Sequence, residues 1–194
     1  MLIEKNKEEI RMTENKYTQK SLEAISQAQG FAIKYGHQNI ENEHLLLSLV
    51  GQAEGLIPGI LQKMGVNTVD LLNDVQNRLD KKPKISVQKG QDVYMSTAAK
   101  KILIVAEDYM KKYQDSFISV EHIFLALIDD LTWLKDYGIN KSNFENILKE
   151  VRGYQKVNSQ NPEQTYDVLN KFGKDLVEYA KKGKLDPVIG RDQE

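Results

Sequence analysis

Residues 28–50 read AQGFAIKYGHQNIENEHLLLSLV, and residues 106–128, which lie 78 positions later, read AEDYMKKYQDSFISVEHIFLALI. The paired segments share Tyr-x(4)-Ile-x-x-Glu-His-x-x-Leu-x-Leu, and Gly65-Val66-Asn67 recurs later as Gly138-Ile139-Asn140. Self-similarity of this length is the signature of a tandem structural repeat. The alternative, two unrelated helical hairpins that agree by chance, is disfavoured because the whole pattern occurs twice.

The periodicity within each copy is helical. Apolar residues recur every three to four positions in residues 18–36, 42–51, 56–64 and 68–79, and strand-like alternation is almost absent. We therefore predict an all-α fold built from two four-helix motifs. Repeat one spans 17–80 and repeat two spans 95–154. The two copies pair their apolar faces to form one pseudo-twofold domain over 17–154.

The flanking segments differ in composition from the repeats. Residues 1–16 form a charged extension, and residues 155–164 are polar and typical of a linker. Residues 165–182 again show a helical apolar stripe, and we expect residues 165–194 to begin a further, truncated domain. The sequence is thus expected to be part of a longer protein, with 155–164 acting as a mobile tether.

Composition excludes several function classes. The net charge of -1 gives no overall attraction to nucleic acid or to an acidic membrane, and the absence of cysteine excludes thiolate chemistry. No phosphate-binding glycine loop, Gly-x-Ser-x-Gly nucleophile motif or His-Glu-x-x-His metal motif occurs. We expect this chain not to be an enzyme and to hold no metal or cofactor, with neither nucleic acid nor membrane as a partner.

Two pairs of repeat-related polar residues stand out. His44 and His122 occupy equivalent positions, and we interpret them as imidazoles that pack helices at the seam between the repeats. Glu43 and Glu121 precede them in the first turn of each helix. They either stabilise the positive helix end or form a pair of carboxylates that receives a basic group, and the sequence leaves both readings open.

The helix near residues 97–113 carries more apolar surface than its core requires. Its core stripe is predicted as Ala99, Ile102, Leu103, Ala106, Met110 and Tyr113. Val105 and Tyr109 then lie on a shoulder beside the stripe, and Ile104 lies behind it. Repeat one has the polar Ser26 and Gln27 in place of Ile104 and Val105. The shoulder is either covered by a second layer or is a solvent-facing binding patch.

The chain resembles the amino-terminal domain of the Clp/Hsp100 AAA+ chaperones, followed by the start of their first ATPase domain. The resemblance rests on the duplicated Ile-x-x-Glu-His box, the Gly-Val/Ile turn and the string GKLDPVIGRD at 183–192. The linker resembles the ClpB disaggregase branch, whereas the two Glu-His pairs are closer to the ClpC branch. The family's Clp N-domain fold agrees with the predicted helical repeat.

The resemblance implies specific site residues. In this family an apolar groove binds exposed hydrophobic segments of unfolded clients, and its positions fall on Leu103, Val105 and Tyr109. A threonine, an aspartate and a glutamate near one surface also matter, and they fall on Thr18, Asp115 and Glu121. In ClpC-type relatives, glutamates that match Glu43 and Glu121 receive phosphorylated arginine, so an anionic or adaptor-docking site is the alternative.

The resemblance also implies partners for the full-length protein. They are unfolded or aggregated polypeptides, the DnaK chaperone system and further copies of the chain in a homohexamer. The missing ATPase domains would form that ring and use ATP with Mg²⁺. This chain by itself would be a monomer, and the protein would be cytoplasmic.

Overall fold

The computed structural model describes residues 16–53, 55–84, 93–153 and 155–162. Repeat one contains helix α2, strand β1 and helices α3, α4 and α5, and their bounds are Gln19–Tyr35, Asn39–Ile40, Asn42–Val50, Leu56–Lys63 and Thr68–Asp80. Repeat two contains β2, α6, α7, the 3-10 helix η1 and α8, and their bounds are Tyr94–Met95, Thr97–Tyr113, Val120–Asp130, Thr132–Tyr137 and Lys141–Arg152. The all-α prediction is confirmed.

The repeats differ at their third helix. The offset between matching residues falls from 78 to 73 across this segment, so repeat two has five fewer residues there. Repeat one has room for the eight-residue α4, whereas repeat two has the six-residue 3-10 helix η1. A 3-10 helix rises more per residue than an α-helix, so the shorter segment still crosses the same gap.

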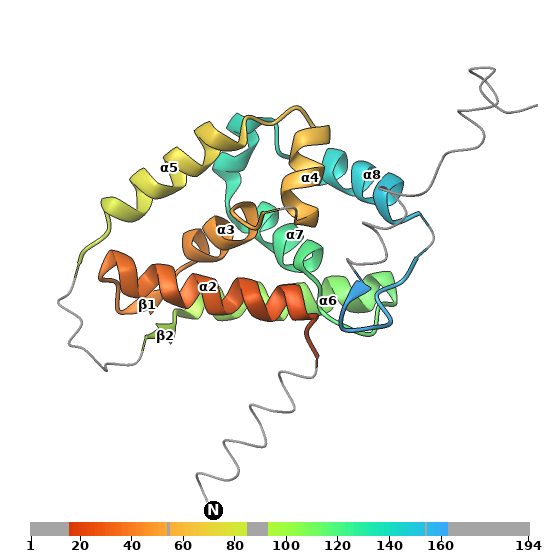
Figure 1. The fold of residues 1–194 in the computed structure, drawn as a ribbon, viewed down its shortest axis with the longest axis horizontal. Coiled ribbons are helices and arrows are strands. Elements are labelled where there is room, and N and C mark those ends of the chain that lie inside the picture. The colour runs from red at the N-terminus through yellow and green to blue at the C-terminus, as the bar shows by residue number, and fades with distance from the viewer. Residues whose placement is uncertain (1–15, 54, 85–92, 154, 163–194) are drawn as a thin grey trace, which may run out of the picture.

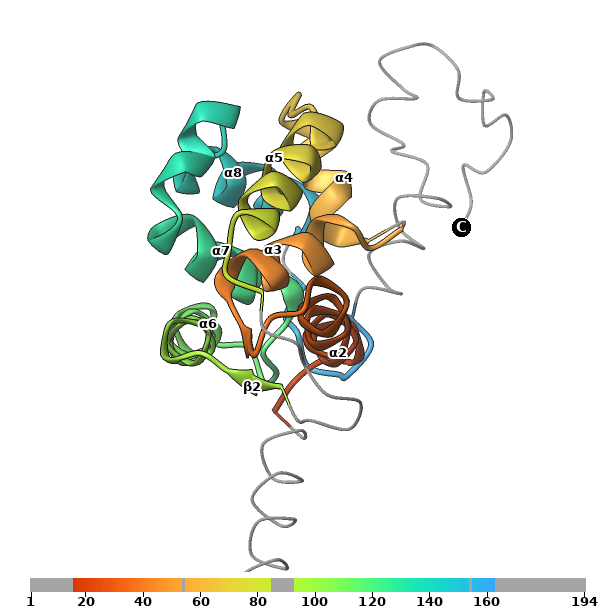
Figure 2. The same ribbon diagram turned by 90° about the vertical axis from the view of Figure 1, so that its left-hand side faces the viewer.

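The helices form layers around the second helix of each repeat. α2 packs against α3, and α6 packs against α7. Figures 1 and 2 show α2 and α6 in one layer, α3 and α7 in the middle, and α4, α5 and α8 on the other side. Every residue from His44 to Val50 and from Val120 to Ile128 is buried. These helices are apolar almost all round, which is the pattern of a helix at the centre of a core.

Two short parallel strand pairings interlock the repeats. β1 pairs with β2 so that Ile40 lies opposite Met95, and an isolated bridge places Tyr17 opposite Ile118. The two pairings are repeat equivalents of each other. Adding 78 to Ile40 gives Ile118, and adding 78 to Tyr17 gives Met95. In each repeat, the residue just before the first helix thus pairs with the segment that follows the first helix of the other repeat. The predicted pseudo-twofold arrangement is confirmed.

The buried face of α6 is rotated from the one predicted. The structure buries Ala99, Ile102, Ala106 and Tyr109, whereas Leu103, Met110 and Tyr113 are only half-buried. Tyr109 retains 6% of its exposure, so placing it on a solvent-facing shoulder was wrong. The Tyr109 hydroxyl donates a hydrogen bond to the Asp129 carboxylate at the end of α7, which satisfies the polar end of a buried ring.

Residues 155–162 lie against the domain and do not form the expected tether. The backbone N–H of Ser116 donates to the Val157 carbonyl at 2.9 Å, and that of Gln19 donates to the Gln160 carbonyl at 2.8 Å. Val157 is fully buried. We call residues 155–162 the exit segment. The proposed domain boundaries stay predictions, and the expectations for residues 1–15 and 163–194 lie outside the described residues.

Candidate functional site

The two repeat-related histidines close the first turns of their helices. His44 is the third residue of α3, and its Nδ1 accepts the backbone N–H of Glu41 at 2.9 Å. His122 does the same in α7 for the N–H of Ser119 at 3.0 Å. Each helix therefore begins with a capping box in which histidine replaces the usual glutamate or glutamine. A histidine three residues after the capping residue is the sequence signal from which this capping role could have been predicted.

The second ring nitrogen of each histidine has a partner seven residues earlier. His122 Nε2 lies 3.0 Å from Asp115 Oδ2, and His44 Nε2 lies 2.9 Å from His37 Nδ1. Asp115 is the repeat equivalent of His37, so the geometry is shared while the chemistry differs. These partners lie within one repeat each, and the expected packing of the two imidazoles at the seam between the repeats stays a prediction.

Repeat two contains a buried cluster of charges. Arg152 Nη2 donates to both carboxylate oxygens of Asp115, at 2.8 and 2.9 Å, and Arg152 Nη1 lies 3.5 Å from Glu121 Oε1. Asp115 also accepts the backbone N–H of Val157 at 2.9 Å. Burial opposes ionisation of Asp115, but the hydrogen bonds from His122 and Arg152 outweigh it and hold the pKa of Asp115 below its ordinary value.

Thr18, Asp115 and Glu121 do not form an exposed surface. Thr18 and Glu121 are fully buried, and Asp115 retains 7% exposure. Thr18 caps α2, since its side chain accepts the backbone N–H of Ser21, and its own N–H donates to the Ile118 carbonyl at 3.0 Å. Within the described part of the chain, neither carboxylate oxygen of Glu121 accepts a hydrogen bond. These side chains therefore offer no exposed contact surface, and their role in function stays a prediction.

The paired glutamates each face a cation. Glu43 Oε2 lies 2.9 Å from Lys82 Nζ, and the Glu43 side chain keeps 18% of its exposure. Glu121 faces Arg152 in the buried cluster. An incoming arginine would have to displace a lysine from Glu43, and it would have no open path to Glu121.

The exposed face of α6 carries an apolar patch. Ile104 is 63% exposed, and Leu103 and Val105 are half-buried beside it. We call these three residues the α6 patch. Tyr109 is not part of it, because its ring stacks on Tyr113 and its hydroxyl is bonded to Asp129.

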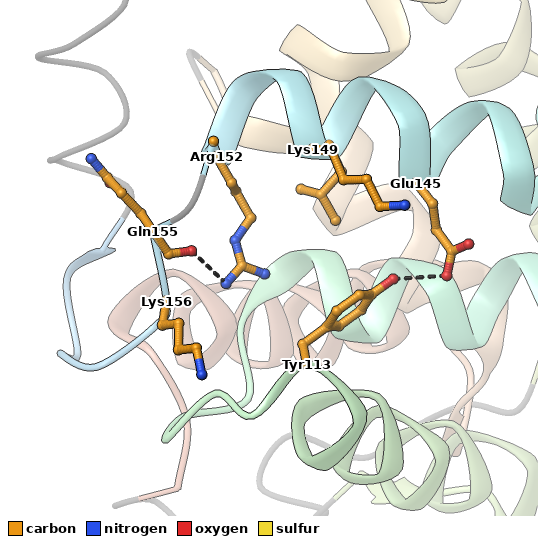
Figure 3. A pocket seen from close by; sticks show the side chains of 8 residues that line it. Tyr113, Glu145, Lys149, Arg152, Gln155 and Lys156 are labelled. Carbon is orange, nitrogen blue, oxygen red and sulfur yellow. Dashed lines mark hydrogen bonds between the residues drawn. The ribbon is translucent and has the colours of Figure 1, made fainter.

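A hollow lies beside the last turns of α8, and the sequence analysis did not predict it. Figure 3 shows Tyr113 from α6 below Glu145, Lys149 and Arg152 from α8, with Gln155 and Lys156 from the exit segment at one side. The cavity measures about 190 Å³. Its lining joins residues that are 43 positions apart in sequence, from Tyr113 to Lys156, and no local pattern announces it.

Two further kinds of feature, a metal site and a membrane-spanning helix, are absent from the described ranges. In those ranges, no three histidine, aspartate or glutamate side chains come together in a way that could hold a metal ion. The helices of the same ranges include none that is both long and apolar enough to cross a bilayer.

Comparison with known proteins decides the family. The model of the Clp repeat (R) N-terminal domain matches residues 16–137. This chain belongs to that family. It is 44% identical over 186 residues to the chaperone protein ClpB of Clostridium tetani, and 39% identical over 188 residues to that of Nitratidesulfovibrio vulgaris. Each alignment covers 92% of this chain and 22% of the relative, so the chain spans less than a quarter of these proteins.

Solved structures agree on the fold. The N-terminal domain of Hsp104 from Candida albicans superposes with a TM-score of 0.66 at 20% identity, covering 76% of this chain and 98% of that one. The N-terminal domain of the ClpV1 ATPase from E. coli superposes with a TM-score of 0.65 at 15% identity, covering 80% of this chain and 97% of that one. Likenesses at these identities establish a shared Clp N-domain fold.

Proposed function

We propose that this chain is the client-recognition part of a ClpB-type chaperone. It binds exposed apolar segments of unfolded or aggregated polypeptides and delivers them to an ATP-driven ring formed by the rest of the protein. Relatives named ClpB, 39–44% identical over nearly the whole chain, support the assignment. A homohexamer that uses ATP and Mg²⁺, cooperation with DnaK and a cytoplasmic location belong to the same proposal.

The exposed side chain of Ile104 is the observation on which the proposed binding surface rests. Repeat one has Ser26 at the equivalent position of α2, so the fold itself does not require an apolar residue there. Burying an isoleucine that is 63% exposed is worth about 1–2 kcal/mol, because full burial is worth about 1.5–3 kcal/mol. That free energy corresponds to a change of about 5- to 30-fold in affinity.

The test compares two exposed isoleucines on equivalent long helices. Ile104→Ser removes the centre of the α6 patch, and Ile33→Ser on α2, where Ile33 is 52% exposed, is the matched control. The probe is reduced, carboxymethylated α-lactalbumin with a fluorescent label, and the measurement is its anisotropy. We expect Ile104→Ser to weaken binding about 5- to 30-fold and Ile33→Ser to leave it unchanged. Equal effects of the two changes, or none, would contradict the proposed surface.

The buried residues Thr18, Asp115 and Glu121 contribute to this function indirectly in our proposal. Thr18 caps α2, and Asp115 holds the exit segment through the N–H of Val157. They would therefore fix where the chain leaves the domain toward the ring. Asp115→Asn should leave the affinity for labelled α-lactalbumin unchanged while it speeds amide exchange in residues 155–160. A loss of client affinity in that variant would instead place Asp115 in the binding surface.

The ClpC-type alternative, in which Glu43 and Glu121 receive phosphoarginine or an adaptor, has less support from the geometry. Both carboxylates already face a cation, and Glu121 is buried. Casein phosphorylated on arginine, compared with unmodified casein, tests it directly. Preferential binding of the phosphorylated form that Glu43→Gln abolishes would establish the alternative.

A further inference from the structure

We propose that the hollow beside α8 is a second docking site, which takes a peptide that presents one apolar side chain next to a carboxylate. We call it the α8 pocket and define it by Tyr113, Leu148, Lys149, Arg152, Gln155 and Lys156. It is formed by residues outside the α6 patch, so the proposal does not depend on the client-binding role of that patch. Figure 3 shows the hollow between the last turns of α8, the Tyr113 ring and the exit segment.

The floor of the pocket is apolar. Leu148 is 3% exposed, and the Tyr113 ring lies beside it. The Tyr113 hydroxyl donates to Glu145 Oε1 at 2.7 Å, so the polar end of the ring is already satisfied. The ring stacks on His122 and Tyr109 and is only half-buried, so part of it still lines the hollow beside Leu148. The volume of about 190 Å³ is below the range of about 300–1,000 Å³ that holds small molecules and cofactors. A single side chain of a peptide suits this size.

The rim of the pocket carries positive charge that the described residues do not neutralise. Within those residues no ion pair is formed by Lys149 or Lys156, and Lys156 Nζ donates only to the side-chain oxygen of Gln114, at 2.8 Å. Glu145 also lines the pocket, but its carboxylate already accepts the Tyr113 hydroxyl and lies 3.4 Å from Lys112 Nζ. The two amines are therefore the groups that an acidic ligand would meet.

Arg152 shapes the back of the pocket and does not supply its free charge. Its guanidinium binds Asp115 with two hydrogen bonds and donates to the Gln155 carbonyl at 3.1 Å. It therefore holds Gln155 and Lys156 in position at the rim. A peptide carboxylate would pair with the two lysines, while its neighbouring apolar side chain would fill the hollow that Tyr113 and Leu148 line.

The pocket is complete only when the exit segment is docked. Gln155 and Lys156 are part of its lining, and Val157 is anchored through its N–H to Asp115 and through its carbonyl to Ser116. A ligand that binds only the docked arrangement must stabilise that arrangement by mass action. Occupation of the pocket would therefore hold the exit segment against the domain and restrict how the domain moves relative to the remainder of the protein.

The test uses labelled peptides and charge-reversed variants of the whole chain. The acidic probe is a glycine-rich peptide with phenylalanine between two glutamates, and its controls replace the glutamates with lysines or the phenylalanine with alanine. Lys149→Glu with Lys156→Glu reverses the rim. Lys63→Glu with Lys100→Glu reverses two exposed lysines elsewhere and is the matched control. Ile104→Ser reports whether the peptide uses the α6 patch instead.

We expect the acidic probe to bind the unaltered chain and both control proteins, and to bind the rim variant at least about tenfold more weakly. Binding should weaken as salt rises from about 50 to about 300 mM, because exposed charges are screened. Added probe should also slow amide exchange at Val157. Equal binding of the lysine peptide, unchanged binding to the rim variant, or loss of binding in Ile104→Ser would each overturn the proposal.

Discussion

Lowering the pH from about 7.5 to about 4.5 should destabilise the domain through His44. The imidazole is fully buried, its Nδ1 accepts the N–H of Glu41, and its Nε2 faces His37 Nδ1 at 2.9 Å. In the neutral state, His44 therefore carries its proton on Nε2 and donates it to His37. A second proton on Nδ1 would face the N–H of Glu41 and break the capping box of α3.

The direction of the effect follows from the shift in pKa. Burial, with the neighbouring charges of His37 and Lys82, lowers the pKa of His44 from 6.5 to about 4. Between these values the unfolded chain binds a proton at His44 and the folded chain does not. The free energy of unfolding is therefore highest above pH 6.5 and falls as the pH drops toward about 4. Burial also lowers the pKa of His37, which acts in the same direction.

The magnitude is large for one side chain. A shift from 6.5 to about 4, at about 1.36 kcal/mol per unit, corresponds to about 3 kcal/mol. Small domains have a total stability of about 5–15 kcal/mol, so the loss is a substantial fraction of it. Carboxylates such as Asp115, whose pKa is held below its ordinary value, contribute their own loss only at lower pH.

Urea unfolding followed by circular dichroism measures the effect across this pH range. His44→Gln keeps an acceptor for the Glu41 N–H, as glutamine does in ordinary capping boxes, but it does not titrate. We expect this variant to be less stable at about pH 7.5 and to lose most of the decline on acidification. Gln38→Asn, a change at an exposed neighbouring residue, is the control and should retain the full decline. An unaltered chain whose urea midpoint does not move, or a His44→Gln variant with the full decline, would refute the reasoning.

Other predictions concern the core, the charge cluster and the patch. Tyr109→Ala should reduce the free energy of unfolding by about 3–5 kcal/mol in urea titrations, because it removes a buried ring, and Tyr109→Phe should cost only about 1 kcal/mol for the lost hydrogen bond. Asp115→Ala should cost about 3–5 kcal/mol, because it breaks the buried pair with Arg152 by removing one partner and also removes the acceptor of the Val157 N–H, and it should speed trypsin cleavage after Lys156. Ile104→Ser should change stability by no more than about 0.5 kcal/mol in thermal melts. A destabilisation by Ile104→Ser as large as that by Tyr109→Ala would show that Ile104 is buried in solution.

The sequence by itself determined the repeat and the helical character of both copies. Helical periodicity and capping are local properties, set by residues three or four positions apart, so they can be read from one stretch of chain. The offset of 78 then paired the two copies and predicted their pseudo-twofold packing. It also pairs Asp115 with His37, so the second partner of each histidine could have been found by asking which residue lies seven positions before it.

The tertiary structure alone decided which side chains face solvent and which charges meet. An ideal helical wheel placed Tyr109 outside the core, but the fold buries its ring, and Asp129 at the end of α7, twenty positions later, accepts its hydroxyl. Asp115 and Arg152 are 37 positions apart and meet because α8 ends beside the start of α7. Partners this distant are chosen by the packing of whole helices, which no local pattern encodes.

The exit segment shows the same limit most clearly. Residues 155–162 have the polar composition of a linker, yet they are held through backbone groups that every non-proline residue possesses, together with the burial of Val157. Composition cannot reveal hydrogen bonds made by the backbone, because their existence depends on which N–H and C=O groups the folded domain leaves unpaired. The sequence therefore determined the two repeats, and the folded surface of those repeats determined the path of the exit segment.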